Sequence, residues 1–432
     1  MRRRILVYGM NYAPEIAGVG RYTGEIGEHL AGLGHEVCVI TTAPHYPGWR
    51  ALGPGSPSRW RRESLAGAEV YRCPVWLHVQ MRGLRRLIAP LSFALSSAPV
   101  AFWQILTRRP EVVIAVEPTL LVAPAALLFG RLVGARLVLH VQDLEVDAAF
   151  AVGHLKGGGW VQRLAEAFER RALAGFERVI TISHRMGERL AAKGVRCDRI
   201  AVVRNWVDLD AIRPTAGGRA AYRAELGLAE DAFVVLYAGA IGAKQGVRLL
   251  LDTARELGTR RDIVFVVAGE GPMKPDLEAA ACTLPNLRVL GFQPQPRFGD
   301  FLAAADLHLL LQERAAADLV LPSKLGAMLA SGRPIVVTAD ADTELAEFLG
   351  ASCAFTPPGD APALARTIAR LAAVPACPRQ SAERLARARL LDKQAAIAEF
   401  ATGALGPEAE PDLQPAAPAS EPRLARELGA GA

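Results

Sequence analysis

Short apolar runs alternate with amphipathic segments along most of the chain. Runs of this kind predict strands at Ile5–Gly9, Glu36–Thr41, Val112–Val116, Arg136–Val141, Val179–Ser183, Ile200–Val203, Phe233–Ala238, Ile263–Ala268, Leu287–Leu290, Leu307–Leu311, Pro334–Thr338 and Cys353–Thr356. They are continuous rather than alternating in polarity, as expected of parallel strands that helices cover on both faces. Stretches between them, such as Trp160–Ala174 and Leu249–Leu257, have helical amphipathic spacing. The pattern therefore predicts an α/β protein.

The runs fall into two successive series, which predicts two Rossmann-like parallel-sheet domains facing across a cleft. The break lies near Arg204–Arg223, so we expect an N-terminal domain over residues 1–204 and a C-terminal domain over residues 205–385. Gln380–Phe400 has the pattern of one long helix. Residues 403–432 are rich in Gly, Pro, Ala and Glu, which predicts a disordered tail.

Composition and charge exclude some classes of protein. The 432 residues are 51% hydrophobic and 22% charged, which excludes a wholly disordered chain. The net charge is +6, but residues 1–110 carry 14 Arg against 6 Asp and Glu, a balance of +8. This asymmetry argues against a protein that coats nucleic acid along its length. It favours a basic N-terminal face directed at a membrane or an anionic substrate.

The cysteines and the N-terminus point to an intracellular protein. The six cysteines are far apart and form no C-x-x-C pair, so we expect buried, reduced thiols. The apolar stretch Ile5–Gly9 after Arg2–Arg4 is too short for the core of a signal peptide. We therefore interpret it as the first strand.

One segment, Ile88–Leu106, has no charged residue and is flanked by arginines. Its length approaches the roughly 20 residues that span a bilayer, but two prolines and several polar residues make a spanning helix the least favoured interpretation. A packed helix and a helix that docks at the membrane interface with its arginine flanks remain open, and both can hold together.

Glycine turns follow predicted strands in both halves. Gly18 and Gly20 stand between the first strand and a helix, which indicates either a plain βα turn or a close backbone approach to a ligand. In the second half, Gly239 and Lys244 follow one strand, and Gly269, Glu270 and Gly271 follow the next. Pro322, Ser323 and Lys324 precede a further helix. Two glycine turns and two lysines at one sheet edge predict a ligand that contains a diphosphate.

Other polar groups have competing interpretations. His140 and Gln142 project from one face of a predicted strand, and Asp143 follows at the end of that strand. His140 is therefore either a core residue with satisfied hydrogen bonds or part of a cleft that binds substrate hydroxyls and transfers protons. The D-x-D pairs Asp208–Asp210 and Asp340–Asp342 lie in polar connections. Such pairs more often cap turns than bind a divalent ion, and we expect no metal site.

With these residues assembled, the chain resembles the retaining GT-B glycosyltransferases of family 4, and within them the colanic-acid-type (WcaI-like) fucosyltransferase subgroup. The resemblance runs from Ile5 to about Phe400. It rests on four stretches: Tyr8–Glu15, Leu139–Ala148, Gly239–Gly246 and Arg314–Leu325.

The resemblance implies an acceptor site in the N-terminal domain, a nucleotide-sugar site in the C-terminal domain, and a last helix, residues 386–402, that returns to the N-terminal domain. It implies transfer with retention, generally without a metal or other cofactor beyond the GDP- or UDP-linked donor. Gly18 and Gly20 would approach the reacting centre. The donor would meet Asn205, Gly239, Lys244, Gly269, Glu270, Gly271, Pro322, Ser323 and Lys324, and the catalytic candidates are His140, Gln142, Asp143 and Lys244.

The subgroup further implies a polyprenyl-diphosphate-linked oligosaccharide as acceptor, and hence a cytoplasmic enzyme held peripherally on the inner membrane surface. Two other classes stay open: a nucleotide-sugar epimerase of the same architecture, and a non-catalytic sugar- or nucleotide-binding protein. A redox dinucleotide enzyme is disfavoured, because Gly18-x-Gly20 lacks the third glycine and no acidic residue closes the second strand.

Overall fold

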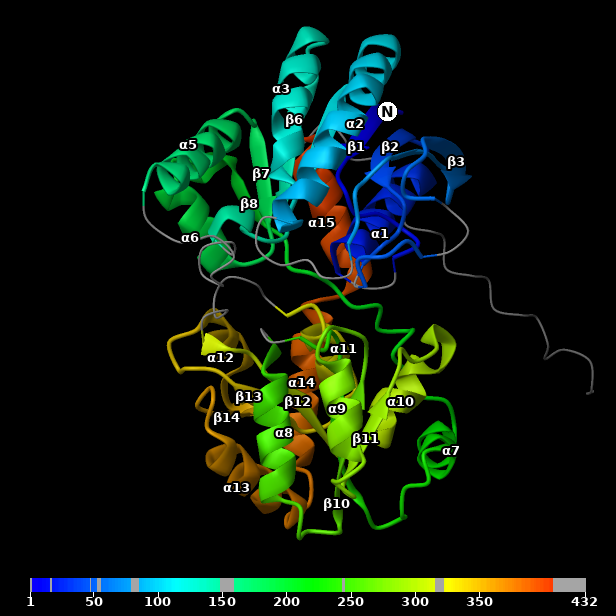
Figure 1. The fold of residues 1–432 in the computed structure, drawn as a ribbon, viewed down its shortest axis with the longest axis vertical. Helices are drawn as coiled ribbons and strands as arrows, with labels where there is room; N and C mark the ends of the chain where they lie inside the picture. Colours follow the sequence, from blue (N-terminus) through cyan, green and yellow to red (C-terminus); the bar gives the residue numbers. More distant parts are fainter. Residues whose placement is uncertain are drawn as a thin grey trace, which may run out of the picture.

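The structure, a computed structural model, describes residues 2–15, 18–46, 48–52, 56–78, 85–147, 159–242, 245–314 and 322–406. The described chain forms two lobes, each built on one β-sheet (Figure 1). Segments near residue 207 and near residue 392 join the lobes, and the last helix lies in the upper lobe with the N-terminal elements (Figure 1).

The N-terminal sheet has the order β3-β4-β2-β1-β5-β6-β7-β8. Its strands are β1 (Arg4–Tyr8), β2 (Glu36–Thr42), β3 (Arg61–Leu65), β4 (Ala68–Cys73), β5 (Val112–Glu117), β6 (Arg136–Val141), β7 (Arg178–Thr181) and β8 (Ile200–Val202). All neighbouring strands are parallel except the edge pair β3–β4. The helices of this lobe are α1 (Gly18–Gly32), α2 (Arg85–Arg108), α3 (Ala123–Leu132), α5 (Trp160–Ala174), α6 (His184–Ala192) and α15 (Lys393–Leu405).

The C-terminal sheet has the order β11-β10-β9-β12-β13-β14 and is parallel throughout. Its strands are β9 (Phe233–Ala238), β10 (Ile263–Ala268), β11 (Leu287–Leu290), β12 (Leu307–Leu310), β13 (Ile335–Thr338) and β14 (Ala354–Thr356). Its helices are α7 (Gly218–Glu225), α8 (Val247–Glu256), α9 (Lys274–Ala281), α10 (Phe298–Ala304), α11 (Leu325–Ala330), α12 (Glu344–Leu349), α13 (Ala361–Ala372) and α14 (Pro378–Arg389).

Strand β1 shows why the apolar runs fold in this way. Ile5 and Val7 belong to the core cluster that contains residues of α1 and α15, whereas Leu6 and Tyr8 belong to the cluster that contains residues of α2 and α3. Because successive side chains of a strand point to opposite faces, a strand buried on both faces must be apolar at every position.

The sequence pattern misses the edge hairpin β3–β4. Strand β3 reads Arg-Arg-Glu-Ser-Leu and is mostly exposed, and β4 alternates between buried and partly exposed positions before its end. Within it Arg61 pairs with Glu63, and Arg62 pairs with Glu69. A solvated edge strand lacks the apolar run that marks a central strand, and its arginines are partly neutralised by these pairs.

The single long helix expected over Gln380–Phe400 is wrong. Helix α14 ends at Arg389 and α15 starts at Lys393, because Asp392 is extended and its side chain caps the amide of Ala395. The break is held by Val207, whose amide donates to the carbonyl of Leu391 and whose carbonyl accepts from the amide of Lys393.

The expected start of the tail at residue 403 is also wrong, because α15 continues through Gly403 to Leu405. Helix α15 packs on α1, β5 and β7, so it does return to the N-terminal lobe. Residues 407–432 lie outside the described part of the chain.

The uncharged segment Ile88–Leu106 forms most of α2. Ala89, Phe93, Ser97, Ala101 and Ile105 are fully buried at every fourth position, although Pro90 and Pro99 lie inside the helix. This stripe confirms a packed helix. The six cysteines are free, but only Cys38, Cys73 and Cys353 are buried, whereas Cys197, Cys282 and Cys377 are exposed.

Candidate active site

The two lobes meet at the carboxyl ends of their strands. Helix α1, which follows β1, reaches the C-terminal lobe through Tyr22, whose hydroxyl donates to the carbonyl oxygen of Ser323 at 3.4 Å. Helix α6, which follows β7, meets α12, which follows β13. Carboxyl ends of parallel strands are where open α/β sheets bind ligands, so this junction is the candidate site.

Lys324 places a buried ammonium beside the glycine turn after β9. Its Nζ lies 3.7 Å from the ring centroid of Tyr237, and a Cβ atom on Gly239 would lie 3.8 Å from Nζ. The ammonium has no hydrogen-bond partner in the part of the chain that the structure describes. Burial lowers the pKa of Lys324 to about 7. An unpaired buried cation beside an open backbone turn suits a bound anion.

The two predicted glycine turns pack directly on each other. The amide of Ile241 donates to the carbonyl of Glu270 at 2.8 Å, which continues the β9–β10 pairing beyond the sheet. A Cβ atom on Gly269 would overlap the carbonyl oxygen of Gly239, and one on Gly271 would overlap that of Ile241. Both glycines also have positive φ angles. They are therefore required by the close approach of the turns, and the Glu270 side chain pairs with Lys274 at 2.7 Å.

On the N-terminal side, Gly18 and Gly20 start α1. A Cβ atom on Gly18 would lie 3.0 Å from the ring of Tyr46, and one on Gly20 would overlap the carboxylate of Glu15. Gly18 has a φ of +64°. Packing against Tyr46 and Glu15 accounts for both glycines, and it brings the loop after β2 to the mouth of α1.

The His140 cluster is a buried polar network. His140 Nε2 lies 3.0 Å from the side-chain nitrogen of Gln142, and Gln142 and Asn205 exchange two amide hydrogen bonds of 2.9 Å. The imidazole packs on Phe400 of α15 with 4.7 Å between ring centroids, and burial lowers the pKa of His140 to about 3. The structure thus confirms that His140 and Gln142 share a face. Asn205 connects the linker to the end of β6 through its hydrogen bonds with Gln142. The catalytic role of His140 stays a prediction.

Of the remaining predicted site residues, the structure describes Asp143, Pro322 and Ser323 but not Lys244. Asp143 follows Gln142 at the end of β6 and is partly buried. Pro322 and Ser323 precede α11, where the carbonyl of Pro322 accepts from the amide of Leu325 at 3.0 Å. Lys244 lies outside the described residues, as does most of the motif between Arg314 and Lys324.

Three of the four D-x-D carboxylates, those of Asp208, Asp210 and Asp340, have local partners. Asp208 caps the amide of Ala211 at 3.1 Å, and Asp210 pairs with Arg213 at 3.2 Å. Asp340 receives two hydrogen bonds from Arg314. Among the described residues no group of three or more His, Cys, Asp and Glu side chains is arranged to hold a metal ion.

Two buried groups at the same edge, Glu117 and Glu15, are not among the site residues predicted from the sequence. Glu117 ends β5, and burial together with the nearby Glu145 carboxylate raises its pKa well above the usual value. Glu15 accepts hydrogen bonds from the backbone amides of His45 and Tyr46 at 2.9 and 3.0 Å. Neither Glu117 nor the Glu15–His45 pair belongs to a recognisable spacing, because each contact joins separate strands.

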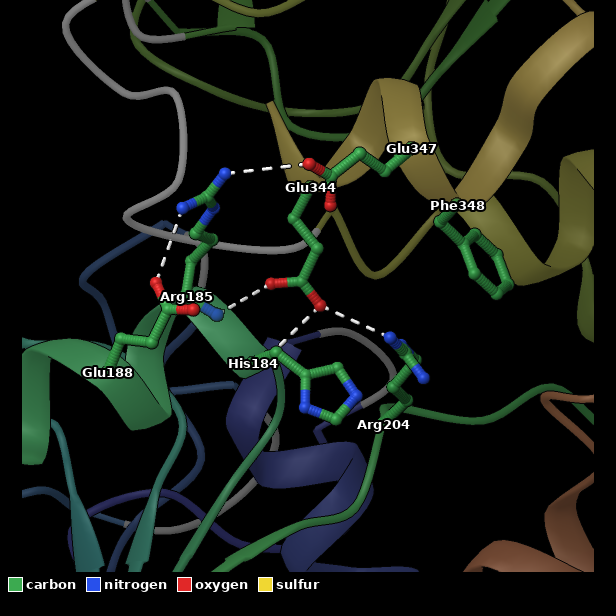
Figure 2. Close-up of a pocket in the computed structure, with 7 residues that line it drawn as sticks. All are labelled: His184, Arg185, Glu188, Arg204, Glu344, Glu347 and Phe348. Atoms are coloured by element: carbon green, nitrogen blue, oxygen red, sulfur yellow. Dashed lines mark hydrogen bonds and ion pairs between the residues drawn. The ribbon is translucent and has the colours of Figure 1, made fainter. Parts of the chain in front are cut away.

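A cavity of about 370 Å³ lies at the junction of the lobes (Figure 2). It is lined from both lobes and the linker by His184, Arg185, Glu188, Arg204, Glu344, Glu347 and Phe348. Figure 2 shows the Glu344 carboxylate pointing at the start of α6 and at Arg204.

Comparison with known proteins matches both lobes to glycosyltransferase models. Residues 17–206 match the "glycosyl transferase 4-like domain", and residues 232–373 match "glycosyl transferases group 1". The putative colanic acid biosynthesis glycosyl transferase WcaI of Escherichia coli K12 is 42% identical over 354 residues, covering 80% of this chain and 85% of WcaI.

Solved structures agree on the fold. Sucrose-phosphate synthase from Thermosynechococcus elongatus superposes with a TM-score of 0.70 at 16% identity, over 93% of this chain and 98% of that one. HepE from Anabaena in complex with UDP and glucose gives a TM-score of 0.63 at 17% identity, over the same shares of each chain. These likenesses confirm two parallel-sheet lobes in the GT-B arrangement.

Proposed function

This chain belongs to the family 4 glycosyltransferases of the colanic-acid type, and we propose that it moves a hexosyl group, such as fucosyl, from a nucleotide-sugar to a lipid-linked oligosaccharide in bacterial exopolysaccharide synthesis. The observation that carries the proposal is the buried, unpaired ammonium of Lys324 beside Gly239. In this proposal it binds the diphosphate of a GDP- or UDP-linked donor.

The electrostatics support a role in the chemical step. Breaking the bond between sugar and diphosphate develops negative charge on the leaving group. A cation held in a dry site stabilises that charge more strongly than water would, and it does not need to reorganise when the charge appears. Lys324 meets this description, and Lys244 from the preceding turn is the second proposed cation.

We propose transfer with retention and without a resident metal. Lys324 and the backbone amides of the glycine turns would compensate the diphosphate charge, while the Asp340 carboxylate is already paired with Arg314. In this proposal the acceptor attacks the same face that the diphosphate leaves. In this proposal Gln142 and Asp143, at the end of β6, would bind substrate hydroxyls, and Asn205, which exchanges two hydrogen bonds with Gln142, would meet the donor.

The proposed acceptor is a polyprenyl-diphosphate-linked oligosaccharide, and the supporting feature is an apolar surface on α2 and α3. These helices lie side by side in Figure 1, with Phe102 against Phe129. Large apolar side chains remain exposed on them: Leu87, Ile88, Leu91, Leu95, Phe102, Trp103, Leu128 and Leu132. We call this set the α2–α3 patch.

The patch suits an interfacial helix rather than a spanning one. Leu87–Arg108 has the length and composition of a membrane span, but 39% of its most apolar stretch is buried inside the protein, and core helices of water-soluble proteins can have the same length and composition. Trp60 extends the patch, since its indole donates to the carbonyl of Ser96 on α2. An enzyme docked in this way would work peripherally on the inner face of the cytoplasmic membrane.

The experiment that tests the proposal is a transfer assay with donor and acceptor varied separately. Purified protein is incubated with GDP-fucose, other GDP-hexoses or UDP-hexoses, with and without lipid-linked oligosaccharide from exopolysaccharide-producing membranes. The proposal predicts a mass increase of the acceptor by one hexosyl unit and release of nucleoside diphosphate only when acceptor is present.

The same assay separates the two alternatives. An epimerase would convert the nucleotide-sugar without acceptor, and a binding protein would bind it without turnover. Either result with every donor and acceptor would contradict the proposed function.

A further inference from the structure

The cavity between α6, the linker and α12 has a lining of mixed charge (Figure 2). Its volume of about 370 Å³ falls within the usual range for small-molecule sites, about 300–1,000 Å³. Two arginines face three glutamates, a balance of −1 when His184 is counted as neutral, and Phe348 adds apolar surface. These charged residues are Arg185, Arg204, Glu188, Glu344 and Glu347.

This lining does not suit a phosphate group. The start of a helix attracts anions through its free amides, but here the amides of His184 and Arg185 already donate to the Glu344 carboxylate, at 3.0 and 2.8 Å. A further anion would also be repelled by the three carboxylates of the lining. The described residues include no group of His, Cys, Asp and Glu side chains arranged to hold a metal ion. The cavity therefore suits a neutral polar ligand.

The side chains offer both acceptors and donors of hydrogen bonds. Glu188 and Glu347 are 65% and 63% exposed, and each pairs with Arg185 through one oxygen, at 3.3 and 3.5 Å. The second oxygen of each carboxylate can accept from a ligand. Arg204 is 27% exposed and meets Glu344 through one terminal nitrogen, so the other can donate to a ligand. Sugars carry hydroxyls that donate as well as accept, together with apolar C–H surface, and match this set of groups.

The cavity lies beside the proposed reaction site. Helix α6 follows β7, the neighbour of β6, and β6 leads into Gln142 and Asp143. Helix α12 follows β13, which is two strands away from β9 and the turn at Gly239. Neighbouring strands are about 4.8 Å apart, so the cavity is offset by one spacing from Gln142 and by two from Gly239. One strand spacing is comparable to the length of a sugar ring, so a neighbouring unit of an acceptor chain would reach the cavity.

We propose that this cavity binds a neutral sugar unit of the acceptor oligosaccharide, next to the unit that receives the transferred hexose. The inference rests on the proposed function and deepens it by assigning a second contact with the acceptor. Because α6, the linker and α12 all line the cavity, a sugar bound there contacts both lobes. The donor site at Lys324 is separate from this contact, so the cavity should affect acceptor binding without changing nucleotide binding.

The test uses the oligosaccharide released by mild acid from the lipid-linked fraction of exopolysaccharide-producing membranes. Its affinity is measured by calorimetry, and the KM of the intact lipid-linked acceptor is measured in the transfer assay. The double variant Glu188→Ala, Glu347→Ala should weaken the affinity and raise the KM at least tenfold, because a hydrogen bond to a charged group contributes about a factor of ten. Its kcat and its dissociation constant for the nucleotide should stay within about twofold of the unmodified protein.

A second variant and a control make the test specific. Glu188→Trp places a bulky side chain in the same cavity and should cause the same loss of acceptor binding. Both altered glutamates are exposed, so the variants should keep the thermal midpoint of the unmodified protein. Glu225→Ala on α7 is the matched control, since Glu225 is 54% exposed and pairs with Arg297 at 2.8 Å outside the cavity. It should bind the oligosaccharide as the unmodified protein does.

Three outcomes would overturn the sugar site. The first is unchanged oligosaccharide affinity and KM in both variants, or no oligosaccharide binding by the unmodified protein. The second is an equal loss in Glu225→Ala, which would assign the effect to general surface charge. The third is a parallel loss of nucleotide affinity, which would place the cavity in the donor site. Absence of transfer, with oligosaccharide binding that the double variant loses, would support the sugar site and refute the proposed function.

Discussion

Glu344 and Arg204 form an ion pair of 3.2 Å where the linker passes between the two lobes (Figure 2). The same carboxylate accepts the backbone amides of His184 and Arg185 at 3.0 and 2.8 Å, at the start of α6. These amide hydrogen bonds, together with the Arg204 charge, lower the pKa of Glu344 although burial opposes the shift. A residue of α12 thus caps a helix of the opposite lobe.

Removing the Glu344 carboxylate should weaken the contact between the two lobes. Glu344→Ala is expected to lower the free energy of unfolding by about 2 kcal/mol, since hydrogen bonds to a charged group each contribute about 1.5–3 kcal/mol and part is regained from water. It should also increase the radius of gyration measured by X-ray scattering. Glu347→Ala is the control, because Glu347 is 63% exposed and its one ion pair within the described part of the chain is with Arg185, at 3.5 Å. Equal effects of the two variants would show that Glu344 does not hold the two lobes together.

The buried ammonium of Lys324 predicts a distinctive pH dependence of stability. The pKa of Lys324 is about 7 in the folded protein, against about 10.4 for an unfolded lysine. Between these values the unfolded chain binds more protons, so the free energy of unfolding should rise as pH increases from 7 to 10. Denaturant titrations at pH 7 and pH 9 should show this gain, and Lys324→Met should lack it. An equal pH profile in both proteins would show that Lys324 is solvated.

Much of the fold follows from local pattern, and the departures have physical causes. Every strand predicted from a continuous apolar run is present, because burial on both faces leaves no room for polar side chains. The exposed strand β3 carries no such run. The break before Lys393 has no proline or glycine to mark it, because it depends on pairing with Val207 far away in the sequence.

The candidate site also combines residues that local sequence predicts with contacts that only the folded chain shows. Glycine turns and a lysine at a helix start are local features, so Gly239, Gly269, Gly271 and Lys324 can be found by spacing. Partnerships such as Glu15 with His45 join residues from separate βα units. Only the folded chain shows that Nδ1 of His45 has partners, whereas Nε2 has none among the residues that the structure describes.

His140 should contribute to acid sensitivity of the fold. Its pKa of about 3 lies below the ordinary 6.5, so the folded protein binds fewer protons than the unfolded chain between these values, and stability falls as pH falls through this window. Between pH 6 and pH 4, the slope of unfolding free energy against pH should decrease in His140→Gln by up to about 1.4 kcal/mol per pH unit. His308, whose pKa is also about 3, should keep its own contribution. An unchanged slope would indicate that His140 is open to water.

The α2–α3 patch should govern membrane binding. Leu95 and Trp103 are 68% and 64% exposed, and burying such side chains in a bilayer interface contributes roughly 1.5–3 kcal/mol each. The double variant Leu95→Ser, Trp103→Ser should therefore weaken binding to anionic phospholipid vesicles by at least tenfold in cosedimentation. Leu164→Ser on α5, where the side chain is 62% exposed, is the matched control. Loss of binding in the control alone would place the contact elsewhere.

The nucleotide-sugar site at Gly239 and Lys324 is the central claim, and calorimetric titration with GDP and UDP tests it most directly. The unmodified protein should bind one of the two, with affinity falling as pH rises above 7 because the bound diphosphate requires Lys324 to be charged. Lys324→Met, which keeps the size of the side chain without its charge, should weaken that binding at least tenfold at pH 7 while the protein remains folded by circular dichroism. Undiminished nucleotide affinity in folded Lys324→Met would contradict the assignment.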